Sequence, residues 1–431
     1  MARLRITALD RRIVGLAVPA LGALIVEPLY NLTDTAIVGH LGRAQLGGLA
    51  LATTVLNLLG WTSAFLQMAT TSRVAFRRGR GDAGGATQAA IAGYVVSLGL
   101  GAFVAILVGV AGPPLAHLLG GHGAIQHNAT TYLQISAVGM PFLLLTLAGT
   151  GHLQGEEDTR TPLRIVLVAN VVNIALELLL VYVARLGITG SAWGTVIAQV
   201  IAAGLFVRTS ARRTARPVQR PPVSDYLELM RDGLALVIRT VALGAALVAS
   251  TAIAAQVGPA TLAGHQIALQ MWILLALSLD ALAVPAQVYV SSALGRDDRA
   301  DAAEIGRRCL LIGLLVSVAV AAGTMALAPA LPYVFSGDGS VRSVATVGLL
   351  LCGALQPFAA IAFVLDGLLL GAAAYATLRT AMLLALVAFA PMAVATLADH
   401  HLGIAGIWLG LTCWLAARCA LLGRRWAQIV A

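Results

Sequence analysis

Twelve apolar runs, each more than 20 residues long, limit most strongly what this chain can fold into. About 20 apolar residues in a helix cross the hydrocarbon core of a bilayer, which is about 30 Å thick. Only 11% of the residues are charged, against roughly a quarter in soluble domains. The sequence therefore predicts an all-α polytopic membrane protein with twelve transmembrane helices. The expected spans are 12–38, 46–72, 86–112, 129–152, 162–184, 188–208, 230–256, 262–291, 305–330, 341–371, 378–398 and 403–423.

The basic residues exclude several function classes. All 28 are Arg, and the chain contains no Lys. A Walker A loop needs a Lys on the nucleotide phosphates, and Schiff-base chemistry needs a Lys amine. An ATP-driven pump, a retinal protein and a pyridoxal enzyme are therefore excluded, and no cofactor is expected. The His and Cys residues show no metal-ligand spacing, so no metal site is expected either.

The Arg residues are unevenly divided between the two sides of the predicted bundle. One set of tails and loops contains almost all of them, whereas the opposite set contains only Arg43, Arg185 and Arg342. By the positive-inside rule both termini are predicted to be cytoplasmic. The net charge of +9 thus reflects topology rather than nucleic-acid binding. All-Arg usage and short loops indicate a bacterial protein of the cytoplasmic (inner) membrane.

An internal repeat relates the two halves of the chain. Sliding the sequence against itself by 216 residues keeps one register from the first span to the sixth. Because six is an even number, both halves insert with the same polarity, as in transporters with parallel repeats. We expect two six-helix lobes, 1–208 and 230–431, related by a pseudo-two-fold axis along the membrane normal and joined by a cytoplasmic loop, 209–229. Matched pairs include Thr35 and Thr251, Gly48 and Gly264, Asp82 and Asp298, Pro141 and Pro357, and Gly155 and Gly371.

Polar side chains at similar depths in three spans are predicted to form one cluster in the outer half of the first lobe. Charged groups at membrane depth are costly and tend to face a cavity or a partner. In the first span, three polar residues with spacing i, i+4, i+7 share one helical face. The fifth span contributes an i, i+4 pair and the sixth a hydroxyl. The expected members are Glu27, Asn31, Asp34, Asn173, Glu177 and Thr195.

Two carboxylates in such a cluster suggest proton coupling. Desolvation and mutual repulsion both favour the protonated form of Asp34 and Glu177. A proton could bind from outside and leave when the cluster rearranges or a cationic substrate arrives. Pro19, near the middle of the first span, removes a helix hydrogen bond and is predicted to let that helix bend.

The second lobe offers secondary candidates. Arg239 and Asp280 are both expected in the inner halves of their spans, where they could form a buried ion pair, or Asp280 could face a substrate. Asp366 lies about five residues from the inner end of its span and is expected at a solvated interface. The acidic run 156–158 is expected to be a solvated cytoplasmic loop.

Several segments resemble the multidrug and toxic compound extrusion (MATE) family, in its DNA-damage-inducible-F-like (DinF-like) branch. They are PLYNLTDTAIVGHLG around Asp34, VVNIALELLL around Glu177, HQIALQMWILLALSLDALAVPAQ, and LDGLLLGA around Asp366. The resemblance covers essentially the whole chain. It implies the MATE fold and efflux of drugs or metabolites driven by an inward H+ or Na+ gradient.

The resemblance also implies roles for individual residues. Asp34 matches the cation-relay acid of the first span, and Pro19 matches the bending proline. Asn173 and Glu177 match the Asn and acid of the fifth span, and Thr195 matches a member of the same site. Glu177 departs from the Asp that is usual in the family. Span seven has no acid, unlike the Na+-coupled NorM-like branch, so H+ is the expected coupling ion and Na+ the alternative.

The sequence therefore predicts a secondary antiporter, with a small lipophilic or cationic substrate and the lipid bilayer as its partners. It is expected to be a monomer and not an enzyme, with no catalytic residues. A lipid-linked precursor flippase of the same superfamily is the main alternative, although Arg239 is the only clear intramembrane base. A major-facilitator carrier does not fit the loop AFRRGRGD. An intramembrane hydrolase lacks any H-E-x-x-H or G-x-S-x-G motif.

Overall fold

The computed structural model describes residues 7–213 and 219–431, and the chain divides into two compact units. Unit 2 is Gly22–Gly233, and unit 1 combines the described residues up to Leu21 with Leu234–Ala431. Helices α1 (Ala8–Gly39) and α8 (Val223–Val257) each begin in one unit and end in the other. The lobe boundaries expected at 208 and 230 stay a prediction, and residues 214–218 of the expected connecting loop lie outside the described residues.

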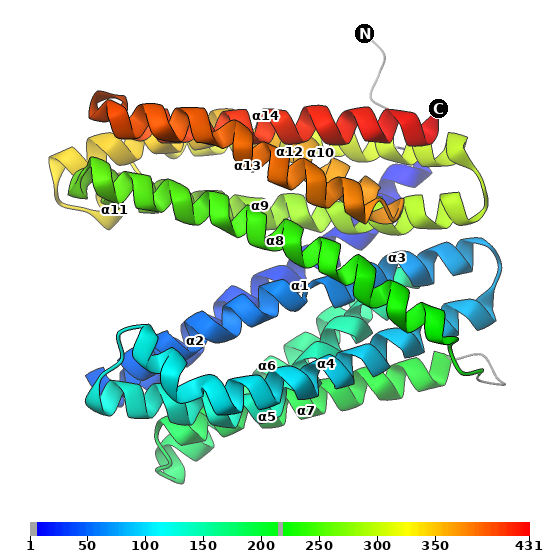
Figure 1. Cartoon of the computed structure of the whole chain (residues 1–431), viewed down its shortest axis with the longest axis horizontal. Coiled ribbons are helices and arrows are strands. Elements are labelled where there is room, and N and C mark those ends of the chain that lie inside the picture. Colours follow the sequence, from blue (N-terminus) through cyan, green and yellow to red (C-terminus); the bar gives the residue numbers. More distant parts are fainter. Residues whose placement is uncertain (1–6, 214–218) are drawn as a thin grey trace. The chain divides into compact units, whose positions relative to one another are not determined.

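In unit 2, one helix, α5, contacts most of the others (the helices are labelled in Figure 1). This helix packs along α4 and also contacts α2, α3 and α7. Its buried face includes Tyr132, Leu133 and Met140, which belong to the main hydrophobic core of the unit. The elements are α2 (Arg43–Ser63), α3 (Phe65–Gly79), α4 (Ala83–Leu118), α5 (Gly123–Gly155), α6 (Arg160–Leu178), the π-helix η1 (Leu179–Val183) and α7 (Ile188–Arg213).

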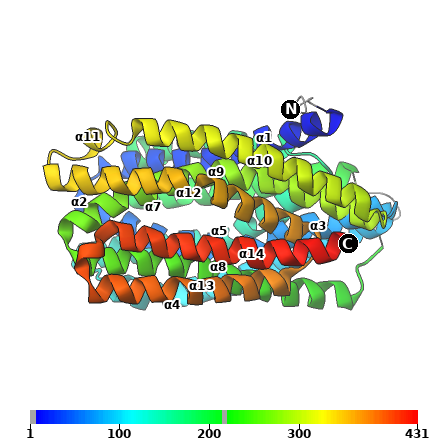
Figure 2. The same ribbon diagram turned by 90° about the horizontal axis from the view of Figure 1, so that it is seen from above.

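Unit 1 has an equivalent centre in α12, which packs against α9, α10 and α14 (Figure 2). Its core contains large aromatic side chains, among them Phe389, Trp408 and Trp414. The elements are α9 (Pro259–Gly295), α10 (Arg299–Leu327), α11 (Pro332–Phe335), α12 (Gly339–Gly371), α13 (Tyr375–Ala398), the 3-10 helix η2 (His400–Leu402) and α14 (Gly403–Val430).

The twelve predicted spans are confirmed. The described residues form 12 helices that are long and apolar enough to cross a membrane. Helices satisfy every backbone hydrogen bond within one segment, which the apolar core of a bilayer requires. Most of them extend beyond the predicted apolar run because polar residues add turns at their ends. The second span is interrupted at Ala64, between α2 and α3.

The internal repeat is visible in the way helices begin. The Asp82 side chain caps α4 by accepting a hydrogen bond of 2.7 Å from the backbone N–H of Gly85. The Asp298 side chain caps α10 in the same way, with a bond of 2.9 Å from the N–H of Asp301. An N-cap carboxylate satisfies a backbone donor that the helix leaves unpaired. The two caps are 216 positions apart, so the repeated sequence makes the same local structure twice.

Close helix packing repeats with the same offset. A Cβ atom added to Gly151 in α5 would lie 2.4 Å from the carbonyl oxygen of Gln67 in α3. A Cβ atom added to Gly367 in α12 would lie 2.5 Å from the carbonyl oxygen of Ala283 in α9. The two glycines are 216 positions apart, and so are the two residues whose carbonyl oxygens they face. Each glycine therefore lets two helix backbones touch at an equivalent place in its own unit.

This packing predicts opposite effects for two glycine substitutions. Gly151→Ala should destabilise the protein by about 1–3 kcal/mol, because the added methyl group overlaps the Gln67 carbonyl. Gly204→Ala in α7 is the matched control, because no atom lies within 4 Å of its added Cβ. That change should stabilise by about 0.5–1 kcal/mol, since alanine lowers the entropy cost of ordering a helix. Unfolding free energies in mixed micelles test both signs, and equal effects would contradict the packing argument.

Candidate functional site

Polar side chains from α1, α6 and α7 meet inside unit 2. The Ser191 hydroxyl of α7 donates a hydrogen bond of 2.6 Å to Oδ1 of Asp34 in α1. The Asn173 amide of α6 donates a bond of 3.3 Å to the Thr195 hydroxyl of α7. Glu177, one helical turn after Asn173, lies within electrostatic range of Asp34. We call these five residues the outer cluster.

The two carboxyl groups of the outer cluster are closed off from solvent. Asp34 is 3% exposed and Glu177 is fully buried. Both carboxyl oxygens of Glu177, and Oδ1 of Asn173, have no hydrogen-bond partner among the described residues. An ionised carboxylate is costly in such a place unless a proton, a cation or a donor compensates it. The arrangement can therefore bind a small positive ion.

Local backbone structure brings Glu177 against α7. A Cβ atom on Gly194 would lie only 3.0 Å from Cγ of Glu177, so a larger residue would displace that side chain. The π-helix η1 begins directly after α6, and π-turns inside helices are frequent at functional sites. Within η1, the Tyr182 hydroxyl donates a bond of 2.8 Å to the carbonyl of Ile37 in α1.

Three side chains in or beside the outer cluster were not predicted from the sequence. Ser191 is the direct partner of Asp34, and the Tyr30 hydroxyl lies 2.9 Å from that of Thr195. Tyr132 of α5 is buried and lies within electrostatic range of Asp34. Helical spacing could have predicted two of them, because Tyr30 lies one turn before Asp34 and Ser191 lies one turn before Thr195. No pattern marked α5 as a contributor.

Three other predicted residues lie outside the outer cluster. Glu27 is exposed and Asn31 is partly exposed, and no side-chain bond joins either of them to the outer cluster among the described residues. Pro19 lies in the part of α1 that belongs to unit 1, and α1 continues as a single helix through it. Its role in bending stays a prediction.

Unit 1 contains a buried ion triad instead. Arg239 of α8 donates a bond of 2.7 Å to Oδ2 of Asp366 in α12, and Arg418 of α14 donates to the same oxygen. Asp366 is 3% and Arg418 1% exposed. The Arg418 guanidinium also lies over the Trp414 ring, 4.7 Å from its centre, where a cation–π contact stabilises it.

The triad corrects two expectations. Asp366 is not at a solvated interface, because guanidinium groups from two other helices compensate its charge inside the unit. The predicted pair of Arg239 with Asp280 is wrong, since Arg239 bonds Asp366, while Asp280 is exposed within electrostatic range of both arginines. Arg418 was not predicted as a site residue, although it is the only charged residue within the predicted span 403–423.

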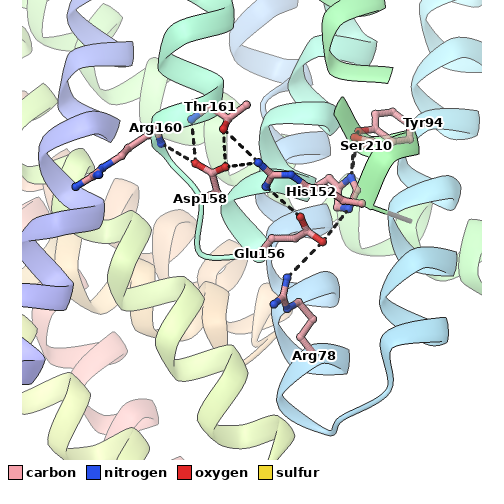
Figure 3. Close-up of polar contacts among 9 residues, drawn as sticks. Arg78, Tyr94, His152, Glu156, Asp158, Arg160, Thr161 and Ser210 are labelled. Atoms are coloured by element: carbon pink, nitrogen blue, oxygen red, sulfur yellow. Dashed lines mark hydrogen bonds and ion pairs between the residues drawn. The ribbon is translucent and has the colours of Figure 1, made fainter. Parts of the chain in front are cut away.

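The acidic run 156–158 is more structured than a solvated loop. Asp158 accepts bonds from the backbone N–H and hydroxyl of Thr161, at 2.9 and 2.6 Å, and one of 2.7 Å from Arg213 (Figure 3). Burial acts to raise the pKa of Asp158, but the bonds from Thr161 and Arg213 outweigh it and lower that pKa. The loop between α5 and α6 is thereby fixed to the end of α7.

The two units differ in chemistry at positions related by the repeat. The counterparts of Asn173 and Glu177 in unit 1 are Phe389 and Ala393, and the counterpart of Asp34 is Ser250. Conversely, Asp366, Arg239 and Arg418 correspond to Thr150, Ala23 and Ala202. The outer cluster and the ion triad are thus each specific to one half of the chain. Among the described residues, no group of His, Cys, Asp or Glu could hold a metal ion.

Comparisons with known proteins cover both halves. The MatE family model matches residues 19–179 and 240–396. Protein DETOXIFICATION 44, chloroplastic, of Arabidopsis thaliana is 31% identical over 357 residues, covering 80% of this chain and 68% of that protein. DNA damage-inducible protein F of Escherichia coli (strain K12) is 27% identical over 327 residues, covering 73% of this chain and 71% of that protein.

A solved structure described as "Crystal structure of MATE in the bent conformation" has the same fold. Its TM-score is 0.91, with 21% sequence identity, and the match covers 98% of this chain and 96% of that one.

Proposed function

Because the chain belongs to the MatE family of transporters, we propose that it is a secondary antiporter that exports lipophilic or cationic small molecules in exchange for protons. The membership confirms the resemblance predicted from the motifs around Asp34 and Glu177. Members of this family are transporters. The chain is a multi-pass membrane protein, and its described residues include 12 apolar helices.

The observation that carries the proposal is the pair of buried carboxyl groups in the outer cluster. Within the part of the chain that the structure describes, neither carboxyl oxygen of Glu177 has a hydrogen-bond donor. The base nearest to Asp34 in the sequence, Arg43, lies beyond the end of α1. A proton is the smallest ion that removes the cost of these buried charges. Loading and unloading it changes the charge inside the unit without any cofactor, and Na+ is the alternative ion.

Antiport requires that the proton and the substrate favour different states of the transporter. A ligand shifts a conformational equilibrium only by its difference in affinity for the two states, and the coupling between two ligands is reciprocal. We propose that the proton enters the outer cluster from the periplasmic side of a bacterial inner membrane and is released to the cytoplasm. The protein acts as a monomer with both termini in the cytoplasm.

Purified protein in liposomes tests this function. Uptake of a fluorescent lipophilic cation is measured with a pH gradient alone, a sodium gradient alone, and neither, and protein-free liposomes serve as the control. We expect a pH gradient that is acid on the periplasmic side to drive export, and a sodium gradient to have no effect. Export driven by sodium alone would replace the proton as coupling ion. Equal rates with and without gradients would contradict antiport.

A further inference from the structure

A second hydrogen-bonded group lies at the other end of unit 2 from the outer cluster. Nδ1 of His152 in α5 lies 3.2 Å from the Tyr94 hydroxyl of α4 and 3.0 Å from the Ser210 hydroxyl of α7 (Figure 3). These two hydroxyl groups are 2.5 Å apart. Nε2 of His152 faces Oε1 of Glu156, at 3.6 Å. We call these four residues the His152 group; the arginine distribution predicts that this end is cytoplasmic.

An apolar layer separates the His152 group from the outer cluster. Thr195 and Ser210 lie on the same helix but 15 residues apart, which is about 22 Å along α7. Between them, Ala202 and Phe206 pack into a buried cluster with Leu153. The side chains of this buried cluster are all apolar. The His152 group is therefore a separate site.

Charged side chains surround the Nε2 side of His152. Glu156 lies beside Nε2, and Arg78 of α3 and Arg213 of α7 each contact its carboxylate, at 3.3 and 3.4 Å. Burial acts to raise the pKa of Glu156, but the contacts with His152 and the two guanidinium groups outweigh it and lower that pKa. Glu156 is therefore ionised throughout the physiological range. Arg213 also forms an ion pair of 2.7 Å with Asp158, which partly neutralises its charge.

Protonation of His152 changes this group in two ways. In the neutral ring, Nδ1 accepts a hydroxyl proton and Nε2–H points to Glu156. In the charged ring both nitrogens donate, so the bond between Nδ1 and a neighbouring hydroxyl reverses direction and the contact with Glu156 becomes an ion pair. Charge-assisted hydrogen bonds are roughly twice as strong as neutral ones. Binding of one proton thus tightens contacts among α4, α5 and α7.

We propose that His152 is a second proton-binding site, and that its proton clamps the inner ends of α4, α5 and α7 and slows transport when the cytoplasm is acidic. Imidazole is the side chain whose protonation changes between about pH 5 and 8. If the proposed antiport holds, each cycle brings a proton inwards. A histidine on the inner side then works as a feedback brake on proton entry.

Hydrogen exchange tests the clamp without any transport. Amide exchange is followed in peptides containing Tyr94 and Ser210, at about pH 8 and pH 6, after correction for the intrinsic pH dependence. We expect protection to rise about tenfold on acidification in the wild type, as charge-assisted bonds replace neutral ones. The rise in protection should be absent in His152→Gln and reduced in Glu156→Gln. If His152→Gln does not fold, the result for Glu156→Gln tests the proposal. His117→Gln, an exposed histidine at the opposite end of α4, should behave as the wild type.

Either of two results overturns the proposal: no change of protection in the wild type, or the same change in His152→Gln. A second experiment measures whether acid on the inner side slows transport. At each inner pH the export rate of the wild type is divided by that of His152→Gln under the same gradient. This ratio should fall about fivefold between inner pH values of about 8 and 6. A constant ratio contradicts the proposed slowing of transport. If neither protein shows gradient-driven export, the proposed function is contradicted, and the hydrogen-exchange result alone tests the clamp.

Discussion

Replacing Asp34 with Asn is expected to lower gradient-driven export about 100-fold, which corresponds to a lost coupling free energy of about 2.7 kcal/mol. The amide is nearly the same size, and its oxygen can still accept the bond from Ser191. It cannot bind and release a proton. The variant should therefore insert and keep its wild-type stability while the link between proton and substrate is lost. Export into inverted vesicles, with an imposed pH gradient, measures the effect.

Asp82→Asn is the matched control for this change. Asp82 is an N-cap of α4, and Asn caps a helix about as well as Asp. Both variants replace a carboxylate of unit 2 by an amide, but only one of them lies in the outer cluster. Substrate exchange without a gradient separates loss of coupling from loss of binding, and it should persist in Asp34→Asn. Wild-type export by Asp34→Asn would remove the coupling scheme.

The second large effect is on stability. Asp366→Asn should destabilise the protein by about 3–5 kcal/mol, because it removes the one carboxylate that the buried guanidinium groups of Arg239 and Arg418 both contact among the described residues. Asp301→Asn is the control, since the bond of Asp301 to Arg296 has the same 2.7 Å length but lies at the surface. Removing an exposed pair costs about 0–1 kcal/mol. Titration with a denaturing detergent in mixed micelles compares the two unfolding free energies.

A triple replacement identifies the cause of that loss. Changing Asp366 to Leu and both arginines to Met removes all three buried charges together. Apolar replacement of a whole buried ion network is often neutral or stabilising, so most of the lost stability should return. A triple variant as unstable as Asp366→Asn would show that shape, rather than uncompensated charge, is what the triad contributes. Equal stability of Asp366→Asn and Asp301→Asn would contradict the argument from burial.

The helices could be predicted from the sequence because the bilayer permits few alternatives. An apolar run of about 20 residues must satisfy its own backbone hydrogen bonds, so hydropathy alone locates a span. Span ends were less accurate, because turns that continue into polar residues depend on caps such as Asp82. The break at Ala64 between α2 and α3 has no marker in the sequence.

The outer cluster was partly predictable for the same reason. Asp34 and Glu177 stand out because charges are rare at membrane depth. Ser191 and Tyr132 do not stand out, since hydroxyl groups are common in membrane helices and often bond their own backbone. Finding them requires knowledge of which helix faces which, and that depends on packing across more than a hundred residues of chain.

The ion triad shows where spacing arguments fail. Arg239 and Asp280 were paired because they lie at similar depths, but depth leaves the rotation of each helix open. The partner of Arg239 is on α12, and the third member, Arg418, lies on α14. Three helices distant in sequence decide the pairing, and side-chain direction on each of them was not available from the sequence.

The repeat carries the same caps and glycine contacts in both halves, yet the buried charges differ. The two halves therefore share their helix packing, whereas their buried polar residues differ. One half contains two buried carboxyl groups with no basic partner among the described residues, which suits exchange of a small cation with the surroundings. The other acquired charges that neutralise one another permanently. A chimera built from two copies of either half should form the same helices as the natural protein. It should not transport, because it would lack either the outer cluster or the ion triad.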